Sequence, residues 1–245
     1  MKAMFSTAAL ACALALAGCG EEGGNLNAAA ANEAAPLPQI AAPNNGDWRE
    51  IASRTDEGFL LGNPNAPVKL VEYASFTCHV CAAFAETATD ELRDTYIRSG
   101  QVSWEIRTFL RNGPDAAFSL LTYCQEPAAF FRTADQIFEQ QEELVEGIDQ
   151  EEAQRIGALP PEQQLAPLAR AMELDTFFAR RGMPESRANQ CLQDQAQVQR
   201  LTDVTSRASR DLQVQGTPTF FINDEKQQVT SWDALEPQLR AAIGG

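Results

Sequence analysis

VEYASFTCHVCAAFAE, residues 71–86, sets two cysteines, Cys78 and Cys81, three positions apart, directly after a run with the composition of a buried strand. The strand is predicted over residues 68–76, which are rich in β-branched and aromatic side chains. Apolar side chains then recur every four residues over residues 80–96, which predicts a helix that ends near Gly100. A strand therefore leads directly into the cysteine pair, and a helix follows it.

The rest of the chain extends this pattern. Residues 101–111 predict a second strand, and a strand, a helix and a strand in succession imply a parallel pair with a right-handed crossover. Residues 112–213 show only helical stretches separated by prolines. A strand is predicted again at residues 218–222, followed by a turn, a short strand through Val229 and a last amphipathic helix. The layout is a small α/β domain that a helical segment interrupts.

The amino terminus predicts export. Residues 1–18 contain an apolar run bounded by small residues, which is typical of a signal peptide. The end of that run, Leu-Ala-Gly before Cys19, resembles the lipobox of bacterial lipoproteins, so Cys19 is expected to carry lipid; the alternative is ordinary cleavage near Ala17. Residues 19–46 are rich in Ala, Asn, Gly and Pro and predict a flexible tether.

Charge and cysteine content limit the partners and the compartment. The chain has 19 Lys and Arg against 34 Asp and Glu, a formal charge of −15. Such a balance repels nucleic acid and anionic lipid headgroups, so membrane attachment is expected through the lipid on Cys19. With Cys12 removed in the signal and Cys19 acylated, four cysteines remain, an even number that suits an oxidising compartment such as the periplasm.

The cysteine pair suggests redox chemistry. If Cys78 lies in the first helical turn with Thr77 as the N-cap, free backbone N–H groups and the helix dipole stabilise a thiolate there. A thiolate attacks disulfides, and Cys81, one turn further on, is placed to resolve the mixed disulfide that results.

Three other interpretations of the cysteine pair fit the sequence less well than redox chemistry. A zinc site needs two more ligands, and the sequence offers no second CxxC and a single histidine, His79, inside the first. Covalent haem requires a histidine after the second cysteine, where Ala82 stands. A structural disulfide with a two-residue spacer constrains little of the unfolded chain. We therefore expect a redox pair and no metal.

A resemblance makes this interpretation specific. A strand ending in EYASFT (72–77), then CHVC (78–81) and a helix, and much later GTPTFF (216–221), resemble the thioredoxin superfamily. The long helical segment makes the chain similar to the DsbA-like thiol-disulfide oxidoreductases. The resemblance implies a thioredoxin-like fold, with a first part at 47–111, a helical insertion at 112–213 and a second part at 214–245.

The resemblance also assigns roles to individual residues. Pro218 matches the family's cis-proline, which leaves backbone groups of Thr217 free to pair with a substrate strand; the alternative is an ordinary trans proline. Glu72 matches a buried acidic residue that relays the proton of Cys81, and the alternative is a solvated carboxylate at the strand edge.

Two further assignments depend on the same resemblance. His79 departs from the family pattern, in which histidine commonly precedes the second cysteine, so the imidazole either favours the Cys78 thiolate or points to water. Cys124 and Cys191 lie in the helical insertion, which some DsbA-like proteins hold with a second disulfide; the alternative is two free thiols.

The sequence thus predicts a lipid-anchored thiol-disulfide oxidoreductase of the cell envelope, with an α/β fold and no metal or organic cofactor. Its partners are expected to be protein substrates with thiols or disulfides and an envelope redox partner. We favour an oxidase; a reductase or isomerase and a non-catalytic, chaperone-like peptide binder remain alternatives. A monomer is expected, because no dimerisation domain precedes the folded body.

Overall fold

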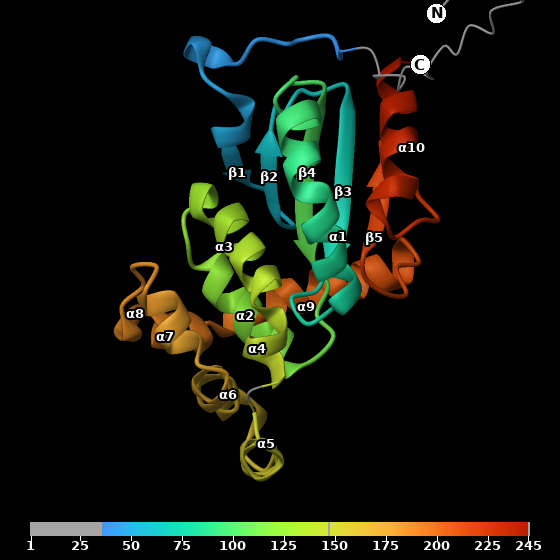
Figure 1. Ribbon diagram of the computed structural model, residues 1–245. Coiled ribbons are helices and arrows are strands. Elements are labelled where there is room, and N and C mark those ends of the chain that lie inside the picture. Colours follow the sequence, from blue (N-terminus) through green and yellow to red (C-terminus); the bar gives the residue numbers. More distant parts are fainter. Residues whose placement is uncertain (1–35, 147, 245) are drawn as a thin grey trace, which may run out of the picture. The chain divides into compact units, whose positions relative to one another are not determined.

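The computed structural model describes residues 36–146 and 148–244 and contains a six-stranded sheet in the order β1-β2-β4-β3-β5-β6 (Figure 1). The central strands β3 and β4 are parallel, as the strand, helix, strand pattern predicted. The other neighbouring pairs are antiparallel. The strands are β1 Ala52–Arg54, β2 Phe59–Gly62, β3 Val68–Ala74, β4 Val102–Thr108, β5 Thr219–Ile222 and β6 Glu225–Lys226.

Helices connect and extend this sheet. Helix α1 links β3 to β4, and helices α2 to α9 follow β4 and precede β5, which confirms the thioredoxin-like fold with inserted helices. The short strand expected through Val229 is only β6, which ends at Lys226; the turn before it places Asn223 and Asp224 at positive φ. The helices are α1 His79–Glu91, α2 Gly113–Tyr123, α3 Pro127–Glu139, α4 Gln141–Glu146, α5 Gln150–Gly157, α6 Leu165–Ala171, α7 Leu174–Ala179, α8 Glu185–Leu192, α9 Gln195–Asp211 and α10 Trp232–Gly244.

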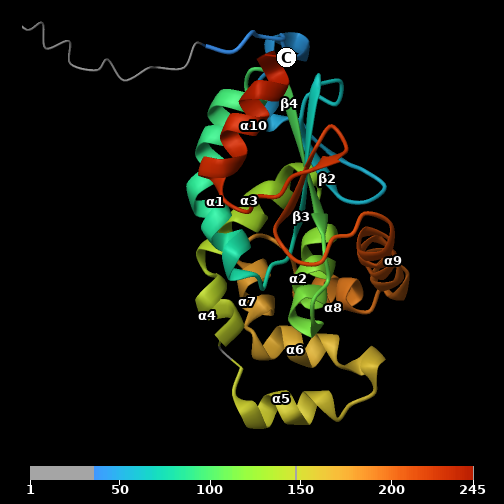
Figure 2. The ribbon, with the colours of Figure 1, turned by 90° about the vertical axis from the view of Figure 1, so that its right-hand side faces the viewer.

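The sheet has a helix layer on each face. Figure 2 shows α1 and α10 on one side and α9 on the other. On the α1 side, Phe84 packs against Phe220 of β5, with ring centroids 4.5 Å apart, and against Trp232 of α10 at 6.3 Å. On the α9 side, Tyr73 and Phe221 share a smaller cluster with apolar residues of α9. Apolar side chains that alternate along β3 and β5 thus cover both faces.

The β1–β2 hairpin was not predicted. The sequence showed only an apolar piece near residue 60, because β1 is three residues long and mostly exposed, so it carries no alternating pattern. In the structure, β2 pairs with β4 and β1 extends the edge.

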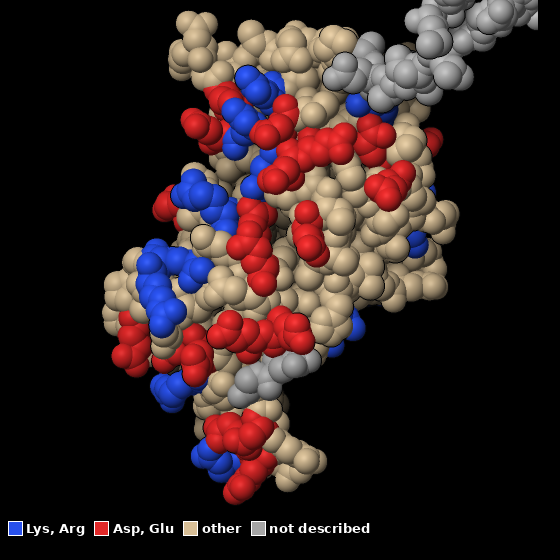
Figure 3. Space-filling model, viewed as in Figure 1, with Lys and Arg blue, Asp and Glu red and all other residues tan. Residues whose placement is uncertain are grey.

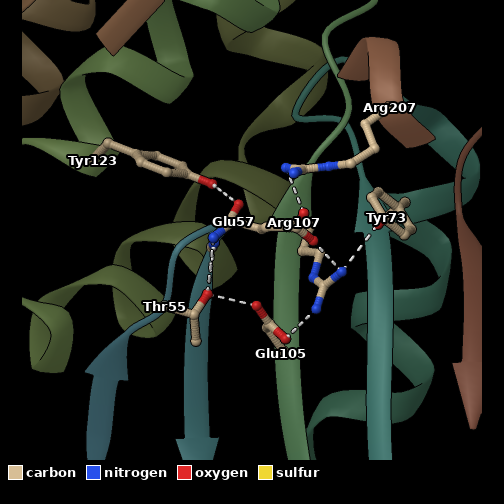
Figure 4. Close-up of polar contacts among 8 residues, drawn as sticks. Thr55, Glu57, Tyr73, Glu105, Arg107, Tyr123 and Arg207 are labelled. Carbon is tan, nitrogen blue, oxygen red and sulfur yellow. Dashed lines mark hydrogen bonds and ion pairs between the residues drawn. The ribbon is translucent and has the colours of Figure 1, made fainter. Parts of the chain in front are cut away.

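A buried polar network holds the loop of that hairpin against the sheet (Figure 4). Arg107 of β4 forms ion pairs with Glu57 and Glu105, and its guanidinium donates to the Tyr73 hydroxyl at 3.1 Å. Glu57 also pairs with Arg207 of α9 at 2.5 Å. The loop, β4 and α9 are therefore joined on the face of the sheet opposite α1.

The folded body begins before Asp47. A compact unit starts at Leu37, whereas the sequence predicted a tether that extends to residue 46. The N–H of Ile40 donates to the carbonyl of Ser99 at 2.8 Å, and the Trp48 indole donates to the carbonyl of Ile40 at 2.8 Å. Part of the expected tether is thus packed on the body.

The amino-terminal predictions lie outside the described residues. These are the signal peptide at 1–18, the lipid on Cys19 and most of the tether at 19–46. Over residues 36–146 and 148–244, no helix combines the length and the apolar character needed to cross a bilayer.

A disulfide joins two helices of the insertion. Cys124, at the end of α2, is bonded to Cys191 of α8, with the two Cα atoms 6.0 Å apart. The bond closes a loop with a sequence separation of 67 residues. Such a cross-link removes conformational entropy from the unfolded chain.

We expect the double variant Cys124→Ala/Cys191→Ala to lower the free energy of unfolding by about 2–4 kcal/mol, because the unfolded chain regains that entropy. Urea unfolding of the full chain measures the change. Cys78 and Cys81 are kept as free thiols in both the variant and the parent, so the difference between the two reports the loss of the Cys124–Cys191 bond. An unchanged urea midpoint in the first variant contradicts a structural role for the bond.

Candidate active site

The two cysteines meet at the start of α1. Cys78 is the N-cap residue, with φ −96° and ψ 112°, and Cys81 lies in the first turn. Both are free thiols; Cys78 is 5% exposed and Cys81 is fully buried. The expectation that Thr77 caps the helix and that Cys78 lies within its first turn is wrong by one residue. Cys81 lies deeper than Cys78.

Thr77 is held by another element, which explains the shift. Its N–H donates to Oδ1 of Asp115 at 3.0 Å, and its hydroxyl accepts a hydrogen bond from Nδ2 of Asn112 at 3.1 Å. Both partners lie at the start of α2. The side chain that could have capped α1 therefore fixes the loop before Cys78 to the helical insertion.

Cys78 is strongly acidic for a thiol. A hydrogen bond with the Cys81 side chain lowers the pKa of Cys78 to about 5, and the backbone N–H groups of Val80 and Cys81 contribute to the shift. Burial acts in the opposite direction and is the smaller effect. The exposed N–H groups of a helix terminus are thus directed at the sulfur, as the sequence argument required. At neutral pH, Cys78 is a thiolate.

Cys81 has the opposite character. Burial raises its pKa well above the ordinary thiol value, and the hydrogen bond to Cys78 and the charge of Glu72 add to the rise. Glu72, on β3, is 2% exposed, and the Trp104 indole donates to its Oε2 at 3.1 Å. Burial raises the pKa of Glu72 to about 8. Glu72 therefore lies in the core rather than at a solvated edge.

Pro218 and Thr217 complete the site from the other half of the fold. The Thr217–Pro218 peptide bond is cis, and Sγ of Cys78 lies 3.1 Å from the carbonyl oxygen of Thr217. Among the described residues, the N–H of Thr217 has no hydrogen-bond partner. A segment 139 residues away in sequence thus contacts the reactive sulfur.

The sequence and the fold both resemble those of known proteins. Residues 54–241 match the sequence model of the thioredoxin family. The chain belongs to the thioredoxin family. A crystal structure of a protein-disulfide isomerase from Novosphingobium aromaticivorans has 28% sequence identity and a TM-score of 0.73, covering 76% of this chain and 97% of that one. The α-DsbA1 of Wolbachia pipientis shares the fold at 21% identity, with a TM-score of 0.60 and coverage of 76% and 90%.

One curated relative of this thioredoxin-family chain is longer than the chain. A protein of Rickettsia prowazekii (strain Madrid E), named provisionally as a protein-disulfide oxidoreductase, is 25% identical over 198 residues. The match takes in 77% of this chain and 62% of that protein. The chain thus spans about three fifths of the length of this relative.

His79 does not point into the thioredoxin-family active site. Its side chain is exposed, as is Val80 at 48%, and within the described residues the imidazole has no hydrogen-bond partner. Of its two predicted orientations, the structure shows the one toward water. In the described part of the chain, no cluster of three or more His, Cys, Asp or Glu side chains forms a candidate metal site.

Two residues that the sequence did not reveal position the cysteines. Asp115 of α2 is fully buried and accepts hydrogen bonds from the Ser75 hydroxyl at 2.8 Å and from the N–H of Thr77. Gln141 of α4 donates to the carbonyls of Phe76 at 2.8 Å and Cys78 at 3.1 Å. Both come from the insertion, and no local motif marks them.

We expect the reduced chain to show a thiolate that titrates near pH 5, because its hydrogen bonds lower the pKa of Cys78 to that value. In the folded, reduced chain the ionised form is held between about pH 5 and pH 9, whereas the unfolded chain is protonated there. Cys78 therefore adds stability that is complete above pH 9 and is lost as the pH falls through 5.

The ultraviolet absorbance of the thiolate, followed against pH with Cys78→Ser as a blank, measures this pKa. A midpoint near the ordinary thiol value would contradict the assignment of Cys78 as the activated thiol. Cys81→Ala provides a second check: it removes the strongest hydrogen bond to Cys78 and should move the midpoint upward.

Proposed function

We propose that the chain is a protein thiol-disulfide oxidoreductase of the DsbA type that acts through Cys78 and Cys81. The observation that carries this proposal is the opposite displacement of the two thiol pKa values: Cys78 is lowered to about 5, and Cys81 is raised. A low-pKa thiol beside a buried partner suits an attacking and a resolving sulfur. The Novosphingobium protein-disulfide isomerase and the Rickettsia protein, named as an oxidoreductase, support an activity in thiol-disulfide exchange.

The proposed exchange transfers electrons between sulfur atoms only. In the oxidised enzyme, a substrate thiolate attacks Sγ of Cys78, the S–S bond to Cys81 breaks, and Cys81 leaves as a thiolate that takes up a proton. Glu72 is the proposed relay for that proton. A second substrate thiolate then attacks the mixed disulfide and releases the Cys78 thiolate. The substrate loses two electrons to the cysteine pair, and no cofactor takes part.

We propose the oxidising direction. The hydrogen bonds that lower the pKa of Cys78 stabilise the reduced enzyme, so they favour transfer of its disulfide to substrates. The free N–H of Thr217 can pair with an extended substrate strand beside the site. The proposed location is the cell envelope, with the chain attached to a membrane through lipid on Cys19 and acting as a monomer. A separate envelope redox partner would restore the disulfide.

Oxidation of a fluorescent dithiol peptide by the purified full chain tests the activity. One equivalent of the oxidised chain should convert one equivalent of peptide to its disulfide without added metal or organic cofactor. Alkylation of reduced Cys78 before reoxidation should abolish the reaction. Peptide oxidation at the uncatalysed rate would contradict the proposal. Diacylglycerol on Cys19 in mass spectra of the mature amino terminus tests the anchor, and an unmodified terminus there would refute it.

A further inference from the structure

A groove of about 600 Å³ runs along α1 from the active-site end, between that helix and α3 and α4. His79, which follows the reactive cysteine, lines its mouth, together with Gln141, which donates to the carbonyl of Cys78. Figure 3 shows a hollow between acidic side chains that gather over α1 and α3. A chain bound in the groove would therefore extend directly from the reactive sulfur.

The walls of the groove carry unbalanced negative charge. Arg93, two residues after the end of α1, pairs with Asp135 of α3 at 2.6 Å, which neutralises one carboxylate. No other carboxylate of the groove has an ion pair among the described residues. These carboxylates come from α1, α3 and α4: Glu86, Asp90, Glu139 and Glu142.

Polar groups without partners also line the groove. Thr89 is 9% exposed, and its hydroxyl oxygen has no hydrogen bond among the described residues. Thr87, on the same helix, instead donates to the carbonyl of Ala83 one turn back, at 2.9 Å. Nε of Arg93, four residues after Thr89, is likewise buried without a partner. The Thr89 hydroxyl and Nε of Arg93 are thus two donors without acceptors, four residues apart on the helical surface that lines the groove. The carbonyl oxygens of a bound peptide would be acceptors for both.

The floor of the groove is apolar. It includes Ala82 and Ala85 of α1 and Phe138 of α3. Lysine and arginine lay their methylene stems on apolar surface while their charged ends reach polar groups, so this floor with an acidic rim suits such side chains. From His79 to Arg93 the helix rises about 21 Å. An extended peptide covers that length with about six residues.

We propose that this groove binds a cationic segment of the polypeptide substrate, next to the cysteine that reacts with Cys78. The proposal rests on the proposed function and narrows its substrate class to chains with lysine or arginine near the reacting thiol. The carboxylates attract the basic side chains and steer their approach, while Thr89 and Arg93 bond to the peptide backbone.

The binding test separates this proposal from the exchange activity. Two labelled peptides contain serine in place of cysteine and differ only in their flanks, Lys-Ala-Lys or Gln-Ala-Gln. For the full chain, fluorescence anisotropy at low ionic strength should show roughly tenfold or more tighter binding of the lysine peptide, with the difference mostly lost in about 0.5 M salt. Equal binding of the two peptides by the full chain overturns the proposal.

Matched variants locate the site. Glu86→Gln/Asp90→Asn/Glu139→Gln should abolish the preference for lysine. Glu151→Gln/Glu162→Gln/Asp211→Asn, which removes the same charge from exposed positions elsewhere, should keep it. If both variants lose the preference, the net charge of the chain explains the tighter binding of the lysine peptide, and the proposal is overturned.

A third variant tests the uncharged contact. Thr89→Val should weaken binding of the lysine peptide about threefold to fivefold at low and at high salt, because the lost hydrogen bond carries no charge. Unchanged affinity overturns the role of Thr89. The same peptides with cysteines restored report exchange separately: binding with no oxidation refutes the proposed function and leaves the groove proposal standing.

Discussion

Replacement of Cys78 by serine is expected to lower the rate of disulfide exchange with a dithiol peptide by at least about a thousandfold. Serine preserves the size of the side chain and the N-cap position but has no sulfur, so the variant forms no Cys78–Cys81 disulfide for a substrate thiolate to attack. Stopped-flow fluorescence of peptide oxidation by the full chain measures the loss.

Cys81→Ser is the matched comparison. Mixed with two peptides joined by one disulfide, its Cys78 thiolate attacks that bond and releases one peptide as a thiol. No Cys81 thiol remains to resolve the mixed disulfide, so enzyme and substrate should accumulate as a covalent complex. Mass spectrometry should locate the substrate on Cys78. Wild-type rates in Cys78→Ser, or a peptide bonded to Cys81 in that variant, would contradict the assignment of the two roles.

Glu72→Gln is expected to slow the step that moves the proton to or from Cys81, by roughly ten- to a hundredfold at pH 7. Glutamine keeps the shape and accepts the indole hydrogen bond of Trp104, but it cannot carry a proton. In reoxidation of the reduced chain, Cys81 gives its proton to ionised Glu72, so the parent rate should level off above about pH 8, the pKa of Glu72. The rate in the variant should rise steadily with pH, because water and hydroxide replace the relay.

The same variant should be more stable than the parent at neutral pH. Burial raises the pKa of Glu72 from 4.5 to about 8, so between these values the folded chain holds a proton that the unfolded chain has released. The free energy of unfolding therefore falls as the pH rises through this window. Glu72→Gln removes that loss, roughly 3 kcal/mol at pH 7, as measured by urea unfolding.

Glu105→Gln provides the control for the pH profile of exchange. Glu105 is a buried glutamate of the neighbouring strand β4, on the opposite face of the sheet, where Arg107 pairs with it at 2.8 Å. Its neutralisation should leave the pH profile of exchange unchanged. If Glu72→Gln and Glu105→Gln alter that profile alike, Glu72 is a structural carboxylate and the relay is wrong.

The sequence could predict those parts of the site whose structure depends on residues close together in the chain. The strand before Cys78, the helix after it and the strand at Thr219 each have a pattern that short-range periodicity detects. The match of Pro218 to a family motif then linked the two halves, although nothing in the residues alone places that proline beside Cys78.

The parts that could not be predicted depend on contacts between distant segments. Asp115 and Gln141 belong to helices of the insertion and resemble ordinary helix residues, yet they hold Thr77 and the carbonyl of Cys78. Thr77 has the chemistry of an N-cap, and only its competing partners on α2 explain why Cys78 takes that position. Long-range hydrogen bonds outweighed a local preference here.

The oxidising direction depends on how strongly the reduced pair is stabilised. A pKa near 5 for Cys78 leaves it almost fully ionised at pH 7, whereas a thiol of pKa about 7, as in thioredoxin, is half ionised. That difference in thiolate stabilisation raises the reduction potential by about 50 mV, from about −270 mV to about −220 mV. Further stabilisation of the reduced state would raise it more.

The most direct measurement is therefore the reduction potential of the Cys78–Cys81 pair, from equilibration of the full chain with glutathione buffers at pH 7. The cysteine pair, as the structure arranges it, predicts a potential of about −220 mV or higher, toward the value of about −120 mV that marks a strong oxidase. A potential at or below about −270 mV, that of thioredoxin, would contradict the proposal that the chain donates disulfides to its substrates.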